Sequence, residues 1–504
     1  MGVPLPRAAL CLLLALLSPV ADRRVAAQEP DLARRSQRGK ELMAAGRYPE
    51  AAAVYRELVQ ALPDNAGLLL NLAMALHMAG QDREAVPRFE AALRLEPDLL
   101  PAALLLGASQ MRLGQPAEAL KPLQKAVRLA PDDKDARSML VDALLALRRH
   151  EEAEGHLRRL AALAPSDPAV WFNLGKSYEA LAGRAFEDLL KVDPESPFGL
   201  ALVADARLEQ DQRTAAFHLY RLALERRPVF RGLHAAVAGI YRAAGHPDWA
   251  RVEEEKERAL PPPDCGRDAL ECAFAAGKHR EVAAAASKRK TAEAYYWRAR
   301  AYNELAVESF GRLAALPPSA QSHEWTALTH RNRQRYAESV EQWRKAIALA
   351  PGDPRLKMEL AVTLRLNREL ADAQQVLEEL VRALPEAAEA QYLLGDVLLA
   401  REQPERALPH LEKSVRLEPN EPRARGALGR AYALVGRPAD AIPHLQQALA
   451  GDTDGSVRFQ LARAYQATGR AEQARAAMQD YDEFRKAAQA ASESAGPGAA
   501  LTPP

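Results

Sequence analysis

Few residues of this 504-residue chain have the types and spacing that catalysis or metal binding requires. His410 and His444 share the local sequence Pro-His-Leu, and two imidazoles on one face could bind a metal ion. No third ligand accompanies them, so we interpret them as a repeated surface residue. His150-Glu151 is followed by His156, which is too far along a helix for the metal-binding H-E-x-x-H motif.

A second candidate is the segment GDTDGSVRF, in which Asp452, Asp454 and Ser456 stand at alternate positions. This spacing resembles the start of a calcium-binding loop, but Arg463 stands where the closing Glu would be. We therefore expect a turn that caps the following helix. The chain also lacks a nucleophile elbow, a Walker loop and a dinucleotide-binding glycine motif. The sequence thus predicts no catalytic site, no metal and no cofactor.

Cys265 and Cys272 flank the segment GRDALE. In an oxidising compartment, such a pair favours a disulfide that ties a loop to the following helix. The alternative is two reduced, half-buried thiols. A C-x6-C pair without a nearby His is neither a usual zinc site nor the C-x-x-C redox motif.

The first 27 residues have the order of a secretory signal. A basic start precedes an apolar run of about 13 residues, AALCLLLALLSPV, and the small residues Val25-Ala26-Ala27 precede Gln28. The run is too short to span a bilayer comfortably. We expect an exported protein, periplasmic or secreted, with no transmembrane span after signal removal. The alternative is an uncleaved signal that anchors the chain to the inner membrane.

The elements that position these residues repeat with a period of about 34 residues. In the unit LLLNLAMALHMAGQDREAVPRFEAALRLEPD, the recurring marks are Ala73, Gly80, Ala85, Phe89 and Pro97. Two short antiparallel helices need these types: small residues where they cross, a glycine in the turn, an aromatic residue between them and a proline at the end. The pattern therefore predicts stacked helical hairpins.

Trp171, Leu174, Gly175 and Tyr178 form the first-helix pattern W-x2-L-G-x2-Y. With this segment, the chain resembles the tetratricopeptide repeat (TPR) family, and in particular exported bacterial proteins with many such repeats. The resemblance implies an all-α, right-handed superhelical solenoid of about 14 antiparallel hairpins, some degenerate. In that geometry, the first helix of each hairpin lines a concave wall that binds protein or peptide partners.

Departures from the period divide the chain. Two shortened units share one spacing, with Tyr178, Ala182 and Phe186 in the first and Tyr302, Ala306 and Phe310 in the second. Each predicts one long helix or, near Gly183, a very tight turn. We expect a signal peptide at 1–27, an N-terminal array at 28–196, a middle repeat pair at 197–264, degenerate repeats with the cysteine pair at 265–319, a C-terminal array with a capping helix at 320–488 and a disordered tail at 489–504.

A helical-wheel projection predicts two stretches of inner wall. The apolar N-terminal stretch contains Met43, Leu70, Met74, His77, Met78, Leu104, Met111 and Phe172. The cationic C-terminal stretch contains Arg331, Arg355, Arg365, Tyr392, Arg423, Arg430, Phe459 and Arg463. Methionine suits varied apolar partners, and guanidinium groups suit carboxylates. The alternative is that the apolar residues pack on neighbouring helices and the arginines pair with local acids such as Asp396.

The chain is nearly neutral, with a formal charge of +1. Bulk electrostatics therefore give no attraction to nucleic acid. We expect a non-catalytic scaffold of the bacterial cell envelope that binds partner proteins or peptides in a groove. The alternative is a glycan-binding or cell-wall-binding component, possibly enzymatic, of a polysaccharide secretion system. The sequence assigns no particular partner and no oligomeric state.

Overall fold

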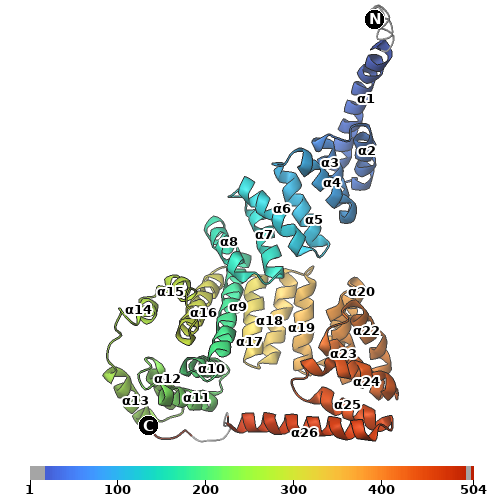
Figure 1. Ribbon diagram of the computed structural model, residues 1–504. Helices are drawn as coiled ribbons and strands as arrows, with labels where there is room; N and C mark the ends of the chain where they lie inside the picture. The colour runs from blue at the N-terminus through green and yellow to red at the C-terminus, as the bar shows by residue number, and fades with distance from the viewer. Residues whose placement is uncertain (1–17, 495–500) are drawn as a thin grey trace, which may run out of the picture. The chain divides into compact units, whose positions relative to one another are not determined.

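The computed structural model describes residues 18–494 and 501–504, and the side chains of 31–489 and 501–504. Over these residues, the chain forms 26 α-helices and one 3-10 turn, with no strand (Figure 1). The predicted all-α class is therefore confirmed. The predicted signal peptide lies outside the described residues up to position 17, and its last residues begin α1 (Ser18–Ala44).

The helices divide into two compact units, Met1–Val170 and Trp171–Pro504. In the first unit, each odd-numbered helix packs against the helix that follows it. These pairs are α1 with α2 (Tyr48–Ala61), α3 (Ala66–Met78) with α4 (Asp82–Leu95), α5 (Leu100–Arg112) with α6 (Pro116–Leu129) and α7 (Lys134–Ala146) with α8 (His150–Leu163).

The second unit contains the other hairpins and two long helices, α9 (Pro168–Val192) and α16 (Ala292–Ala314). Between these lie the pairs α10 (Pro197–Glu209) with α11 (Arg213–Arg226), α12 (Leu233–Ala243) with α13 (Pro247–Ala259) and α14 (Ala269–Ala275) with α15 (His279–Ala286). After them come α17 (Ala320–Asn332) with α18 (Tyr336–Leu349), α19 (Pro354–Leu366) with α20 (Leu370–Ala383), α21 (Ala388–Ala400) with α22 (Pro404–Leu417), α23 (Pro422–Leu434) with α24 (Pro438–Ala448) and α25 (Ser456–Ala467) with α26 (Ala471–Ser494).

The end of the chain differs from the sequence prediction. The capping helix α26 continues to Ser494, beyond the predicted boundary at 488. The predicted disordered tail includes residues 501–504, but these have a defined place, because Leu501 packs against the core of the middle repeats. The composition of the tail is rich in small residues and proline, and it gave no sign of this contact.

Each hairpin turn in the described part of the chain has one residue with a positive φ, in the left-handed region of backbone conformation. Gly80 has a φ of 75°, and its N–H and that of Gln81 bond back to the carbonyls of His77 and Leu76. Glycine adopts this conformation without steric cost. Five turns use another residue there: Arg148, Asp211, Gln334, Arg368 and Glu402. The packing of the two helices therefore sets the turn, even where the sequence lacks its glycine mark.

The helices of a hairpin approach closely where the first helix carries glycine. A Cβ at Gly107 would lie 2.4 Å from Cγ of Leu123 on the second helix. Gly395 and Gly429 repeat this contact, at 2.5 Å, with Leu411 and Leu445. The leucines are fully buried. At these three crossings glycine therefore has a packing role, because a Cβ would overlap the buried leucine.

The shortened units are the two long helices. α9 runs through Gly183 without a turn, and α16 is equally continuous, so the predicted single long helix is confirmed. The two helices pack antiparallel, because Tyr178 stacks on Tyr302 at 6.0 Å and Phe172 meets Phe310 edge-on at 6.5 Å. A Cβ at Gly175 would lie 2.6 Å from the Phe310 ring. The shared spacing thus belongs to two helices that contact each other.

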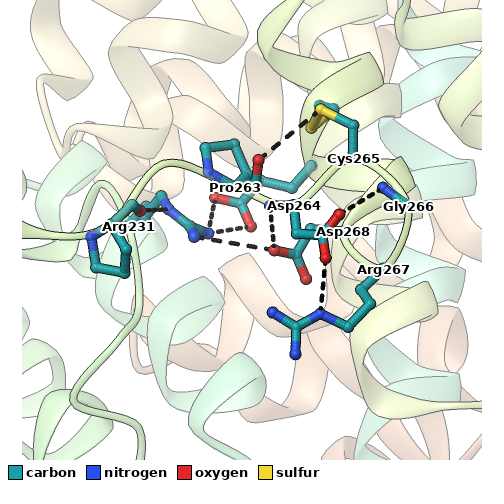
Figure 2. The surroundings of a disulfide bond; sticks show 10 residues. Arg231, Pro263, Asp264, Cys265, Gly266, Arg267 and Asp268 are labelled. Atoms are coloured by element: carbon teal, nitrogen blue, oxygen red, sulfur yellow. Dashed lines mark hydrogen bonds and ion pairs between the residues drawn. A yellow bond between two sulfur atoms is a disulfide. The ribbon is translucent and has the colours of Figure 1, made fainter.

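A disulfide joins Cys265, in the loop after α13, to Cys272 in α14, with the Cα atoms 5.7 Å apart (Figure 2). The same loop is held by Asp264, whose N–H donates to the Asp268 carboxylate at 3.1 Å. Arg231 donates to Glu271 of α14 at 2.8 Å. The short helix α14 is therefore fixed both covalently and by ion pairs.

None of the described helices combines the length and the apolar character that crossing a bilayer requires.

We predict that Gly107→Ala lowers the free energy of unfolding by about 1 to 3 kcal/mol, because the new methyl group forces Leu123 out of its buried position. The matched control is Gly155→Ala in α8, where no atom lies within 4 Å of the new Cβ. The control should stabilise by about 0.5 to 1 kcal/mol, since alanine favours helix. Urea unfolding followed by circular dichroism measures both, and shifts of the same sign would contradict the packing role.

Candidate functional site

The first helices of the C-terminal hairpins form one wall, since α19, α21, α23 and α25 contact one another in order. The predicted cationic residues lie on these helices and on α17. A side chain on this wall can therefore reach the first helix of the neighbouring hairpin. Most of the predicted arginines do so.

Four of the six predicted arginines pair with an acid on a neighbouring first helix. The pairs are Arg331–Glu359 (2.5 Å), Arg355–Glu324 (2.8 Å), Arg365–Asp396 (2.6 Å) and Arg423–Glu389 (3.2 Å). Glu324 and Asp396 are buried, so their charges need these partners. The local pairing that the sequence left open as an alternative is therefore what the structure shows at these positions. These arginines link adjacent hairpins.

Arg423 makes further contacts that fix its position. It donates to Glu421 at 2.8 Å, and this hydrogen bond holds the pKa of the Glu421 carboxyl below its usual value. Its guanidinium lies 5.3 Å from the ring centre of Tyr392. Burial raises the pKa of Tyr392 to about 12, so this hydroxyl stays protonated at neutral pH. Arg423 and Tyr392 thus form a fixed polar edge.

A cavity of about 320 Å³ opens on this wall, bounded by α19, α21, α23, α24, α25 and the loop before α25. It brings together four of the predicted residues, which are Arg365, Tyr392, Arg423 and Arg430. Arg331, Arg355, Phe459 and Arg463 are not among its lining residues. The cavity therefore contains half of the predicted cationic-wall residues, and a binding role for the wall stays a prediction.

The loop side of the cavity carries Asp452 and Asp454, whose spacing in the sequence resembles the start of a calcium-binding loop. Asp452 accepts from the N–H groups of Val457 and Arg458 at 3.2 and 3.1 Å, and Asp454 accepts from that of Ser456 at 2.9 Å. Both carboxylates therefore cap α25, which confirms the predicted turn. The described residues contain no group of three His, Cys, Asp or Glu that could hold a metal ion.

Arg430 is the lining arginine whose charge is not already paired. It lies on α23, half-buried, and over the described part of the chain it has no hydrogen bond, ion pair or ring contact. Arg463 differs, because it is exposed and lies 5.9 Å from the ring of Phe459. Phe459 in turn packs on Tyr481 of α26 at 5.3 Å. Arg430 is thus the arginine of the cavity lining that has no acid partner among the described residues.

The predicted apolar wall is only partly exposed. Met78 is 50% exposed. The half-buried members are Met43, Leu70, Met74, Leu104 and Met111. Phe172 was assigned here wrongly: it is buried against Phe310 and belongs to the second compact unit. An apolar docking surface on the remaining residues stays a prediction.

His77 was also assigned to this wall wrongly, because it is buried in a polar cluster between hairpins. Its Nδ1 lies 2.8 Å from Oδ1 of Asp82 and 2.8 Å from Oγ of Ser109. Arg112 donates to the same Asp82 oxygen at 2.7 Å. The hydroxyl and the carboxylate meet one nitrogen, whereas a catalytic triad places them on opposite nitrogens. The cluster therefore joins α3, α4 and α5.

His410 and His444 are half-buried rather than surface residues. Each contacts the first helix of its own hairpin, His410 through Gln391 at 2.8 Å and His444 through Arg425 at 3.3 Å. Burial lowers the pKa of both imidazoles, so they stay neutral at pH 7. Their shared Pro-His-Leu context reflects a repeated contact inside the hairpin.

A second cavity, of about 410 Å³, lies between α9, α10 and α16, and no sequence pattern indicated it. Its polar lining includes Glu179, Asp205 and Glu209. Burial raises the pKa of Asp205, which accepts a hydrogen bond from the Tyr220 hydroxyl at 2.5 Å. None of these three acidic residues belongs to a recognisable sequence motif. Only the departure of α9 and α16 from the period could have drawn attention to this region.

Comparison with known families agrees with this architecture. Models described as tetratricopeptide repeat match residues 42–108, 110–174 and 433–492, and 303–354, 358–422 and 392–456. Together these segments span more than half of the chain, and the chain belongs to the tetratricopeptide repeat family. Such repeats generally serve as non-catalytic scaffolds for protein–protein interaction.

No curated protein matches the chain. Among solved structures, it is similar to TTC0263, a thermophilic TPR protein of Thermus thermophilus (24% identity, 33% of this chain, 91% of that chain, TM-score 0.29). It is also similar to MamA protein (18%, 38% and 90%, TM-score 0.29) and to a chain of the APC/C hetero-tetramer Cut9–Hcn1 (14%, 84% and 95%, TM-score 0.30). At these TM-scores the similarities carry no argument about function.

We predict that Arg365→Ala lowers the free energy of unfolding by about 1 to 2 kcal/mol, because it leaves the buried Asp396 carboxylate without its cation. Arg430→Ala should change it by less than about 0.5 kcal/mol, since Arg430 has no acid partner to lose. Thermal or urea unfolding compares the two variants on the same wall. Equal losses would show that Arg430 is also a structural ion-pair member.

Proposed function

We propose that this protein is a non-catalytic scaffold whose C-terminal cavity binds a carboxylate of a partner protein, an acidic side chain or a free C-terminus. The proposal rests mainly on one observation: Arg430 lines the cavity without an acid partner among the described residues, while the other two lining arginines, Arg365 and Arg423, are already paired. A guanidinium can donate two parallel hydrogen bonds to one carboxylate. The cavity therefore offers one specific contact.

The paired residues support this contact by holding the cavity in shape. Arg365 and Asp396 link α19 to α21, and Arg423 and Glu389 link α21 to α23. Arg430 lies on α23, so the helix that presents it is tied to the preceding hairpin. Pre-organisation of this kind lowers the entropic cost of binding. The whole chain is nearly neutral and therefore does not attract acidic partners by its net charge. Selectivity for such partners arises from the charge of Arg430 in the cavity.

We predict that the full chain binds an eight-residue peptide ending in three glutamates, and that Arg430→Ala weakens this binding about 10-fold or more, since a charge-assisted hydrogen bond contributes about 1.5 to 3 kcal/mol. Fluorescence anisotropy at two salt concentrations measures it. The matched control is Arg463→Ala, which removes an arginine of the next first helix outside the cavity.

Equal weakening by both arginine variants, or none by Arg430→Ala, would reject the site. The glutamine version of the peptide should bind poorly. Cell-wall glycan fragments serve as a third ligand, because preferential binding of these fragments would favour the glycan-binding alternative.

We also propose that the protein works in the bacterial cell envelope after export. Two observations support this: the signal-like order of the first 27 residues, and the bond between Cys265 and Cys272. Disulfides persist in oxidising compartments and are rare in the cytosol of most organisms. Export from the cytosol would account for both features, because the first segment would direct export and the oxidising compartment would preserve the disulfide.

For the protein isolated from its native cells, we predict an N-terminus at Gln28 and no alkylation of Cys265 or Cys272 before reduction. Quenching with iodoacetamide followed by mass spectrometry gives both readouts. An intact first segment with oxidised cysteines would support the anchored alternative. An intact segment with both cysteines alkylated would place the protein in a reducing compartment.

A further inference from the structure

The last four residues of the chain, Leu501-Thr502-Pro503-Pro504, contact the middle repeats of the same compact unit. The hydroxyl of Tyr241 on α12 donates a hydrogen bond to the Thr502 carbonyl. Leu501 is half-buried against the core that α10, α11 and α12 share, while the three residues after it are exposed. The segment is therefore held by one apolar side chain and one backbone carbonyl.

The tail has the chemistry of a docked peptide. Thr502 precedes a proline, which disfavours helix and favours an extended backbone at that residue. Pro503 and Pro504 have no N–H, so the segment has little capacity to pair with itself. An extended segment of this kind presents its carbonyls outward and suits aromatic surfaces that offer donors.

Packing between aromatic rings holds the surface that receives the tail. The Tyr241 ring is buried between Phe217 and Trp249, with ring centres at 5.3 and 5.5 Å, and Trp249 stacks on His246 at 4.1 Å. Burial raises the pKa of Tyr241, so its hydroxyl keeps the proton that it donates. Over the described residues, the Thr502 carbonyl is the hydrogen-bond partner of this hydroxyl. The donor is thus directed at the site that the tail occupies.

From these contacts we infer that α12 and its neighbours form a second peptide-binding surface, which takes an extended segment with an apolar residue followed by Thr-Pro-Pro. The chain's own C-terminus occupies this surface as an internal ligand. A partner segment with the same chemistry must displace the tail to bind there. The surface lies apart from the Arg430 cavity, so failure of either proposal leaves the other standing.

The test uses the full chain with Leu501→Asp, which vacates the surface by placing a charge against the apolar core. A fluorescein-labelled peptide, AGPGAALTPP, should bind this variant saturably. It should bind the wild-type chain at least ten-fold more weakly, because a tethered tail competes at a high effective concentration. A chain ending at Ala500 provides a second vacated form, and circular dichroism checks that each variant is folded.

Tyr241→Phe in the vacated chain should weaken peptide binding about 5-fold or more, since it removes the donor and keeps the ring. The control is Tyr336→Phe, on α18, which should leave binding unchanged. A peptide with aspartate in place of leucine should not bind. The inference is overturned if neither vacated chain binds the labelled peptide, or if wild type and vacated chains bind it equally. In either case, the tail would be only a structural strap.

Discussion

The close approach of two helices within each hairpin is the constraint on which the rest of the structure depends. It requires a small residue on most first helices where the second helix crosses, and at Gly107, Gly395 and Gly429 this residue has no Cβ beside a buried leucine. Because this contact recurs, neighbouring hairpins present the same faces and share a continuous core. The turn between the two helices adapts to this packing. Arg148 and Glu402 therefore adopt a left-handed backbone conformation that glycine would favour. In these hairpins, the packing of the helices therefore determines the backbone conformation of the turn, even at residues that do not favour that conformation.

Once the hairpins stack, the inner wall becomes a place where charges of different repeats meet. Arg365 and Asp396 are 31 positions apart in sequence, yet their charged atoms lie 2.6 Å apart across adjacent first helices. Such a pair contributes to the stacking and at the same time removes a charge from the wall. A groove rich in arginine can therefore have little net attraction for anions. In the proposed function, recognition of a carboxylate depends on Arg430, because this arginine has no acid partner among the described residues.

Much of the fold was predictable from the sequence, because apolar periodicity and small residues at crossings are local in each repeat. The all-α class, the hairpins, the two long helices and the turn before α25 follow from such marks. The site was less predictable. A wheel projection places His77 and Phe172 on an inner face, but it omits the neighbouring helices that bury them. Similarly, it cannot separate Arg423 from Arg430, since their acid partners or lack of them depend on the adjacent repeat.

The departures from the repeat have a common physical origin. A hairpin that becomes one helix has no second helix to cover its flank, so α9 and α16 cover each other through Tyr178 and Tyr302. The space beside them is the cavity that contains Asp205, and the repeats between them carry the surface on which Leu501 packs. In a regular array, each hairpin uses its faces for stacking on its neighbours. Breaks in the array therefore leave faces that stacking does not cover, such as the cavity beside α9 and α16 and the surface against which Leu501 packs.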